Sequence, residues 1–202
     1  MTRRPSWTRR LLAPAIKRGS ALARNQDGAV LVEFALLAVP FFALVFAILE
    51  TSLTFLAQQV LDSALQDATR SIRTGQSQAS WSTEQFRREV CGRTFGLFEC
   101  SASDAGTERL RIKVEPVTDF DTAVGQIGLP VDPTCTEPGA EEAACDWTLA
   151  ESFDDGRGSD VIIAQAFYKW PTLVNLPWFN LANQAGNNRL LSAVRVFKNE
   201  PF

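Results

Sequence analysis

The chain of 202 residues contains no histidine. This absence excludes the Ser-His-Asp and Cys-His catalytic constellations and any histidine-bound metal. The four cysteines form no C-x-x-C pair, so the usual redox motif and zinc-ligand spacing are missing too. A Ser-Lys dyad would need no histidine, but no motif supports one. We therefore expect no catalytic site, no metal and no cofactor.

Basic residues are absent from Ala29 to Thr69, and Glu33 is the only charged residue between Ala29 and Leu49. A helix of about 20 apolar residues crosses a bilayer core. A cleaved secretory signal has an apolar core of only about 7–15 residues, followed by a small-residue cleavage site. The sequence Glu50-Thr51-Ser52 is a poor match to such a site. We therefore predict a membrane span over residues 29–50.

Residues 1–28 hold seven basic side chains and one acidic side chain, so this leader carries a net charge of +6 in a chain of net charge −3. The positive-inside rule places the leader in the cytoplasm and the rest of the chain on the other side. Residues 7–24 could form an irregular amphipathic helix interrupted by Pro14. A basic cluster can also indicate nucleic-acid binding. Because this cluster lies beside a span, we expect it to set the membrane topology and to contact anionic lipid. We expect no nucleic-acid partner.

Glu33 lies inside the predicted span, near its start. A carboxylate in hydrocarbon is costly, which makes an intramembrane acid a candidate functional residue. The alternative is that Glu33, one turn from the interface, reaches the headgroups with its side chain.

The residues around Glu33 resemble a known processing site. Gly28, four apolar residues, Glu33 and then Phe34 are similar to the site of type IV pilins, where a prepilin peptidase cuts after the glycine. The continuation through Pro40 resembles the TadE-like minor pseudopilins of the tight-adherence (Tad/Flp) pilus. The resemblance covers residues 24–75, with a fainter likeness over residues 160–202, whereas residues 76–159 resemble no family.

This resemblance implies a function in Tad/Flp pilus assembly, and hence in adhesion and surface colonisation. It implies cleavage between Gly28 and Ala29, and pairing of Glu33 with the new amine of a neighbouring subunit, which sets helix register. The implied partners are prepilin peptidase, other Tad pilins and pseudopilins, the inner-membrane assembly platform and the lipid bilayer. The implied location is the bacterial inner membrane, with a periplasmic C-terminal domain, or a surface pilus. The alternative is an uncleaved, signal-anchored periplasmic module that binds or acts on a ligand.

The helical pattern continues beyond the span. Apolar residues recur every three or four positions, at Leu53, Leu56, Ala57, Val60, Leu61, Ala64, Leu65, Ala68 and Ile72. Gly75 is a typical C-terminal stop. We predict one helix from Ala29 to about Thr74, whose outer part, residues 51–75, packs on a periplasmic domain of residues 76–202. Pro40 lacks an N–H and should kink the span near the Leu36 carbonyl.

The domain should be α+β, with a sheet of roughly three antiparallel strands laid on the first helix, a pilin-like arrangement. Ser82 and Gln85 have capping-box spacing for a second helix ending near Gly96. Phe86, Val90 and Phe95 are the expected members of its buried face. The predicted strands cover residues 110–115, 160–170 and 189–198, and residues 117–158 and 171–188 are expected to be loops.

All four cysteines lie on the predicted non-cytoplasmic side, where thiols oxidise. Four cysteines allow three pairings. We favour Cys91–Cys100 and Cys135–Cys145, because short loops close easily. Zinc is the alternative, but the ligand spacing is wrong. The acidic run from Asp154 to Asp160 could suggest calcium. It lacks the EF-hand spacing and the closing Glu, which favours a solvated turn.

Overall fold

The computed structural model describes residues 27–77, 81–100, 109–137, 140–141, 145–176 and 178–201. The proposed leader helix at residues 7–24 lies outside this part. The chain divides into two compact units at the Phe46–Ala47 junction, and each unit is treated by itself below.

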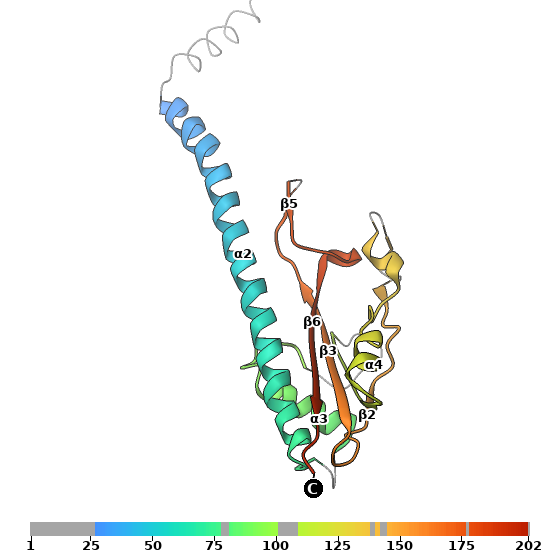
Figure 1. The fold of residues 1–202 in the computed structure, drawn as a ribbon. Helices are drawn as coiled ribbons and strands as arrows, with labels where there is room; N and C mark the ends of the chain where they lie inside the picture. The colour runs from blue at the N-terminus through green and yellow to red at the C-terminus, as the bar shows by residue number, and fades with distance from the viewer. Residues whose placement is uncertain are drawn as a thin grey trace, which may run out of the picture. The chain divides into compact units, whose positions relative to one another are not determined.

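One α-helix, α2, runs from Asp27 to Arg73 (Figure 1). The prediction of a single helix from Ala29 to about Thr74 is therefore confirmed over this range, and the helix ends one residue earlier, at Arg73. Gly75 follows with a φ of 75°, and its N–H donates to the carbonyl of Ile72. This left-handed conformation is favourable for glycine and closes the last turn of the helix.

The second unit contains a four-stranded mixed sheet, in the order β2-β1-β3-β6. Its long strands are β1 (Leu110–Val117), β3 (Val161–Pro171) and β6 (Asn188–Lys198), paired antiparallel as expected. The α+β prediction is confirmed, but the expected number of three strands is wrong. The fourth strand, β2 (Ser152–Phe153), pairs in parallel with β1. A strand of two residues is too short to show the alternation of apolar and polar residues by which strands are recognised in a sequence.

The first predicted strand ends at residue 115, because the proline that follows should stop it, yet Pro116 lies within β1 opposite Ile162. Proline is tolerated in a strand where its missing N–H is not needed by a neighbouring strand. The short β2 pairs only with Lys113 and Val114, so Pro116 lies beyond the paired part of that edge.

The main core lies between one face of the sheet and two helices, the outer part of α2 and α3 (Thr83–Gly92). The α2 residues that are almost completely buried there are Ala57, Leu61, Ala64, Leu65, Ala68 and Ile72. The capping box of Ser82 and Gln85 is present at the start of α3. Phe86 and Val90 are buried as predicted, whereas Phe95 lies past the end of the helix and is 93% exposed.

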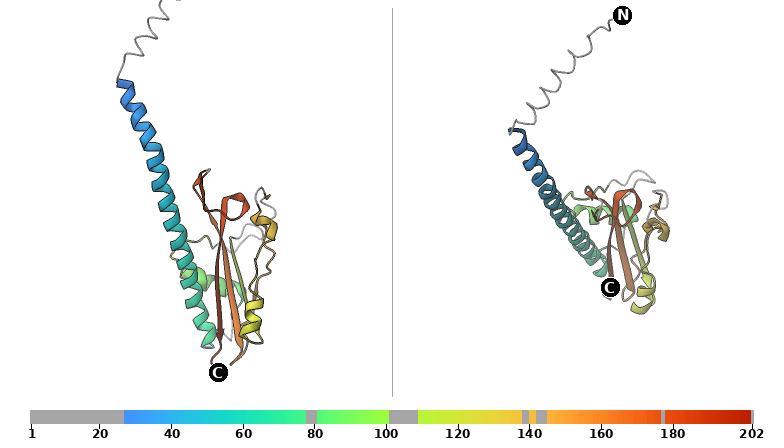
Figure 2. Two further views of the ribbon diagram at one scale, coloured as in Figure 1. Left: turned by 45° about the horizontal axis from the view of Figure 1, so that its top comes forward. Right: turned by 90° about the horizontal axis from the view of Figure 1, so that it is seen from above.

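The opposite face of the sheet is covered as well, and β3 is buried over residues 161–168. A short helix, α4 (Phe120–Gly125), contacts β1 and β3 there (Figures 1 and 2). The segment 117–158, expected to be a loop, also contains the 3₁₀ turn η1 (Pro133–Thr136). Residues 171–188 contain a two-stranded hairpin, β4 (Asn175–Leu176) and β5 (Phe179–Asn180), and the 3₁₀ turn η3 (Ala185–Asn187).

The free edge of β6 is partly covered by side chains. Gln58 of α2 donates to the carbonyl of Ser192, and Asn183 accepts from the N–H of Leu190, both at 2.8 Å. Arg195 is half-buried between β6 and α2, where its guanidinium lies 3.0 Å from the carboxylate of Asp62. An unpaired edge strand invites pairing with another chain, and polar groups that occupy the edge oppose this.

Candidate functional site

The first unit exposes an almost continuous apolar surface. Among the described helices, α2 alone is long and apolar enough to cross a membrane. The side chains of its most apolar stretch are not buried within the protein. A core helix of a soluble protein would bury such residues. The exposed side chains include Val30, Leu31, Val32, Phe34, Leu36, Leu37, Val39, Phe41 and Phe42. This surface suits lipid or the helices of other subunits.

Gly28 lies in α2, directly after the first residue that the structure describes, and is exposed. A Cβ added there would meet no atom within 4 Å, so nothing in the described structure crowds this peptide segment. The helix spans the proposed cleavage point between Gly28 and Ala29.

Glu33 and Phe34 are both exposed on α2. Within the described part of the chain, no hydrogen bond or ion pair reaches the carboxylate of Glu33. Because Glu33 follows Ala29 by four residues, the two lie one turn apart on one helix face. The carboxylate is thus available to a partner outside this chain.

Pro40 lies inside α2, which continues on both sides of it. Its nitrogen carries no hydrogen and cannot donate to the carbonyl of Leu36. The kink at Pro40 stays a prediction.

Comparison with known proteins agrees with these features of α2. Residues 28–70 match the family model of TadE-like protein. The resemblance predicted from Gly28, Glu33 and Phe34 is confirmed over this segment, which begins at the proposed cleavage glycine. The family indicates involvement in Tad pilus assembly. No curated protein and no solved structure matches the chain.

The TadE-like segment also contains an acid whose role sequence reasoning missed. Glu50 is only 6% exposed, although it directly follows the apolar run. Its two carboxylate oxygens accept the backbone N–H groups of Leu173 and Val174, at 2.6 and 2.5 Å. Glu50 thereby joins α2 to the connection that leaves β3. The signal in the sequence was an acid at a span boundary, but its partners lie more than 120 residues away.

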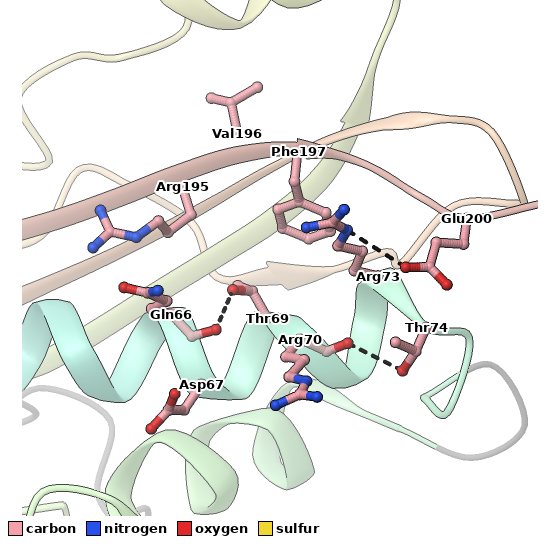
Figure 3. Close-up of a pocket in the computed structure, with 10 residues that line it drawn as sticks. All are labelled: Gln66, Asp67, Thr69, Arg70, Arg73, Thr74, Arg195, Val196, Phe197 and Glu200. Carbon is pink, nitrogen blue, oxygen red and sulfur yellow. Dashed lines mark hydrogen bonds and ion pairs between the residues drawn. The ribbon is translucent and has the colours of Figure 1, made fainter.

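A polar groove of about 610 Å³ lies at the opposite end of the second unit, between the end of α2 and the end of β6 (Figure 3). Arg73 lies 3.8 Å from Glu200, and both side chains are more than half exposed. The hydroxyls of Thr69 and Thr74 donate to helix carbonyls, those of Gln66 and Arg70. The tail is held there by the Arg73–Glu200 ion pair and by the N–H of Glu200, which donates to the carbonyl of Arg73 at 3.0 Å. The lining of the groove supplies no nucleophile paired with a base.

Both favoured disulfides are formed, Cys91–Cys100 and Cys135–Cys145. The first joins the end of α3 to the segment beside the main core, and the second closes a small separate cluster with Val131. Among the described residues, no group of three or more Cys, Asp or Glu is arranged to hold a metal ion.

The acidic run at residues 154–160 forms a structural turn. Its carboxylates accept internal hydrogen bonds, Asp154 from the N–H of Gly156 and Asp160 from the N–H of Arg157. Asp155 accepts from the hydroxyl of Ser77. Gly156 has a φ of 61°, and a Cβ there would lie 2.7 Å from Ile162. The turn therefore needs glycine at this position for both conformation and space.

Proposed function

We propose that this protein is a minor pseudopilin-type component of a Tad/Flp pilus, anchored in the inner membrane by α2 and processed by a prepilin peptidase. The observation that carries the proposal is the position of Gly28, Glu33 and Phe34 at the start of an exposed apolar helix. The same helix carries the TadE-like match. The basic leader supports a cytoplasmic N-terminus and a periplasmic second unit. Its partners would be the peptidase, other Tad pilins and the assembly platform.

The proposed role of Glu33 follows from the chemistry of cleavage. A cut after Gly28 creates an amine on Ala29 at the start of an apolar helix. Opposite charges in a poorly hydrated environment are far less costly together than apart. The carboxylate of Glu33 has no partner among the described residues, which leaves it free to bind the amine of a neighbouring subunit. Such a contact would set the axial register of packed helices.

Processing is tested on the full chain expressed with its peptidase. Mass spectrometry of the membrane form should find Ala29 at the N-terminus, and Gly28→Leu should leave the precursor uncut. Gly125→Leu is a matched control, because a Cβ at Gly125 also meets nothing within 4 Å. It should be processed normally.

An N-terminus at Met1 in the mature membrane fraction would contradict this proposal. That result would favour the alternative, a signal-anchored periplasmic module that keeps its leader.

A further inference from the structure

The connection between β3 and β6, residues 171–188, contains no charged residue. It is long, and it exposes two large apolar side chains, Leu173 at 84% and Trp178 at 76%. An exposed segment of a soluble domain usually carries charges, so an uncharged segment that exposes two large apolar side chains is a candidate contact site. The question is what this connection contacts.

Its position is fixed by Glu50. The carboxylate of Glu50 holds the N–H groups of Leu173 and Val174, so the start of the connection lies at the level of Glu50 along α2. By sequence, Glu50 is the last residue of the predicted span and directly follows the apolar run that ends at Leu49. The connection is therefore held at the level where the apolar span ends.

The neighbouring surface of α2 is of the same kind. Beyond Glu50 the helix carries no charge until Asp62, and it exposes Leu53, Phe55 and Leu56. Glu50 itself is buried under the connection. The carboxylate of Glu50 thus faces protein. The nearby cation, Arg189, is half-buried and donates to the carbonyl of Leu181 at 2.8 Å, so it is held by the connection itself.

Three asparagines within the connection bind one another. The amide of Asn175 donates to Asn187 at 3.2 Å, and that of Asn180 donates to Asn175 at 3.3 Å. Asn180 also accepts the N–H of Ala182 at 2.8 Å. Polar groups that already have hydrogen-bond partners within the protein cost less free energy to move into an environment with little water.

We infer that residues 171–188 are a membrane-contact loop, which rests on the bilayer surface beside the end of the span and inserts Leu173 and Trp178 among the lipid headgroups. Tryptophan is enriched at this level of membranes because its ring is apolar and its N–H can bind polar groups. An uncharged loop avoids the cost of desolvating ions there. The inference rests on the proposed membrane anchoring of α2. Its consequence is a second unit held in one orientation on the membrane before assembly.

The test uses the full chain reconstituted in vesicles of phosphatidylethanolamine and phosphatidylglycerol. The native cysteines are joined in disulfides, so Leu173→Cys can be labelled with an environment-sensitive fluorophore without reductant. Val124→Cys is the control, because Val124 is an apolar residue of α4 that is 68% exposed. Gln126, two residues further along, accepts from the side chain of Gln165 in the middle of β3, and the extended chain from Gln165 to Leu173 spans roughly 26 Å.

We expect a blue shift at residue 173 and loss of emission when lipids brominated near the headgroup are included, with neither effect at residue 124. In unlabelled protein, Trp178→Phe should remove part of the bromolipid quenching of tryptophan, and Trp147→Phe should not. An equally unquenched label at residues 173 and 124 overturns the inference. So does a label at residue 173 that is shielded only after other pilus proteins are added, since the loop would then contact protein.

Flotation of the same samples separates the two proposals. A chain that does not float with vesicles contradicts membrane anchoring by α2, whereas a chain that floats with an unquenched label contradicts the membrane-contact loop alone.

Discussion

The carboxylate of Glu50 accepts the backbone N–H of Leu173 at 2.6 Å, although 123 residues separate them in the chain. A second oxygen of the same group accepts the N–H of Val174. One buried acid therefore attaches the end of the sheet to the helix that carries the apolar span.

Glu50→Gln should destabilise the second unit by about 1–3 kcal/mol, because one amide oxygen replaces two anionic acceptors and a buried N–H loses its partner. Thermal unfolding of the full chain in nanodiscs measures this. Glu84→Gln, an exposed position on α3, is the control and should change stability little. Equal stability of both variants would show that the Glu50 contacts contribute nothing to the stability of the second unit.

Arg87 on α3 is a cation that is only 3% exposed. Its guanidinium pairs with Glu151 and donates to the carbonyl of Leu110 at 3.0 Å. Arg87→Met should cost about 3–5 kcal/mol, because it leaves the mostly buried Glu151 without its main partner. The adjacent exposed Arg88→Met should be nearly neutral. Arg87→Met combined with Glu151→Gln should recover part of the loss, and a purely additive loss would argue against coupling of the pair.

The disulfide Cys91–Cys100 closes a short loop beside the core. Replacing both cysteines with serine should lower the free energy of unfolding by about 2–4 kcal/mol, chiefly because the unfolded chain gains conformational entropy without the cross-link. Denaturant unfolding measures the change, and non-reducing peptide mapping should still recover Cys135–Cys145 in the variant. Recovery of crossed pairings in the wild type would contradict the structure.

Tyr168 is the single tyrosine of the chain, so its ionisation can be followed by tyrosinate absorbance. Burial of the phenol raises its pKa above the ordinary value of 10.0, although the N–H of Glu99 and the charge of Arg109 oppose the shift. Because the pKa is raised in the folded state, the stability it contributes is present below pH 10 and is lost as the pH rises through the native pKa. Native protein should titrate at higher pH than denatured protein. Coincident curves would contradict a buried neutral phenol.

Glu33→Gln tests the registry role. If Glu33 binds the amine of a neighbour, the variant should insert and be cut after Gly28, yet fail to join or support the pilus. If its side chain only reaches the headgroups, the neutral residue should insert more easily and assemble normally. Counting pili and pilus components that co-purify decides between them, with Glu137→Gln, an exposed acid of the second unit, as the control.

The sequence alone was sufficient for the elements that local patterns specify. The period of apolar residues along α2, the glycine that ends it and the capping box at Ser82 each act within a few residues. The disulfides were predictable because each joins cysteines nine or ten residues apart. The site motif from Gly28 to Phe34 is equally local, and the TadE-like match begins with it.

Tertiary structure decided the rest. Leu53 and Leu56 fit the helical stripe, yet they remain about half exposed because the main core begins at Ala57. The two residues of β2 become a strand only because β1 offers an edge to pair with. Glu50 is an ordinary acid in the sequence. It becomes a structural residue because β3 delivers two unpaired N–H groups to it, and no pattern within one segment records a contact between distant segments.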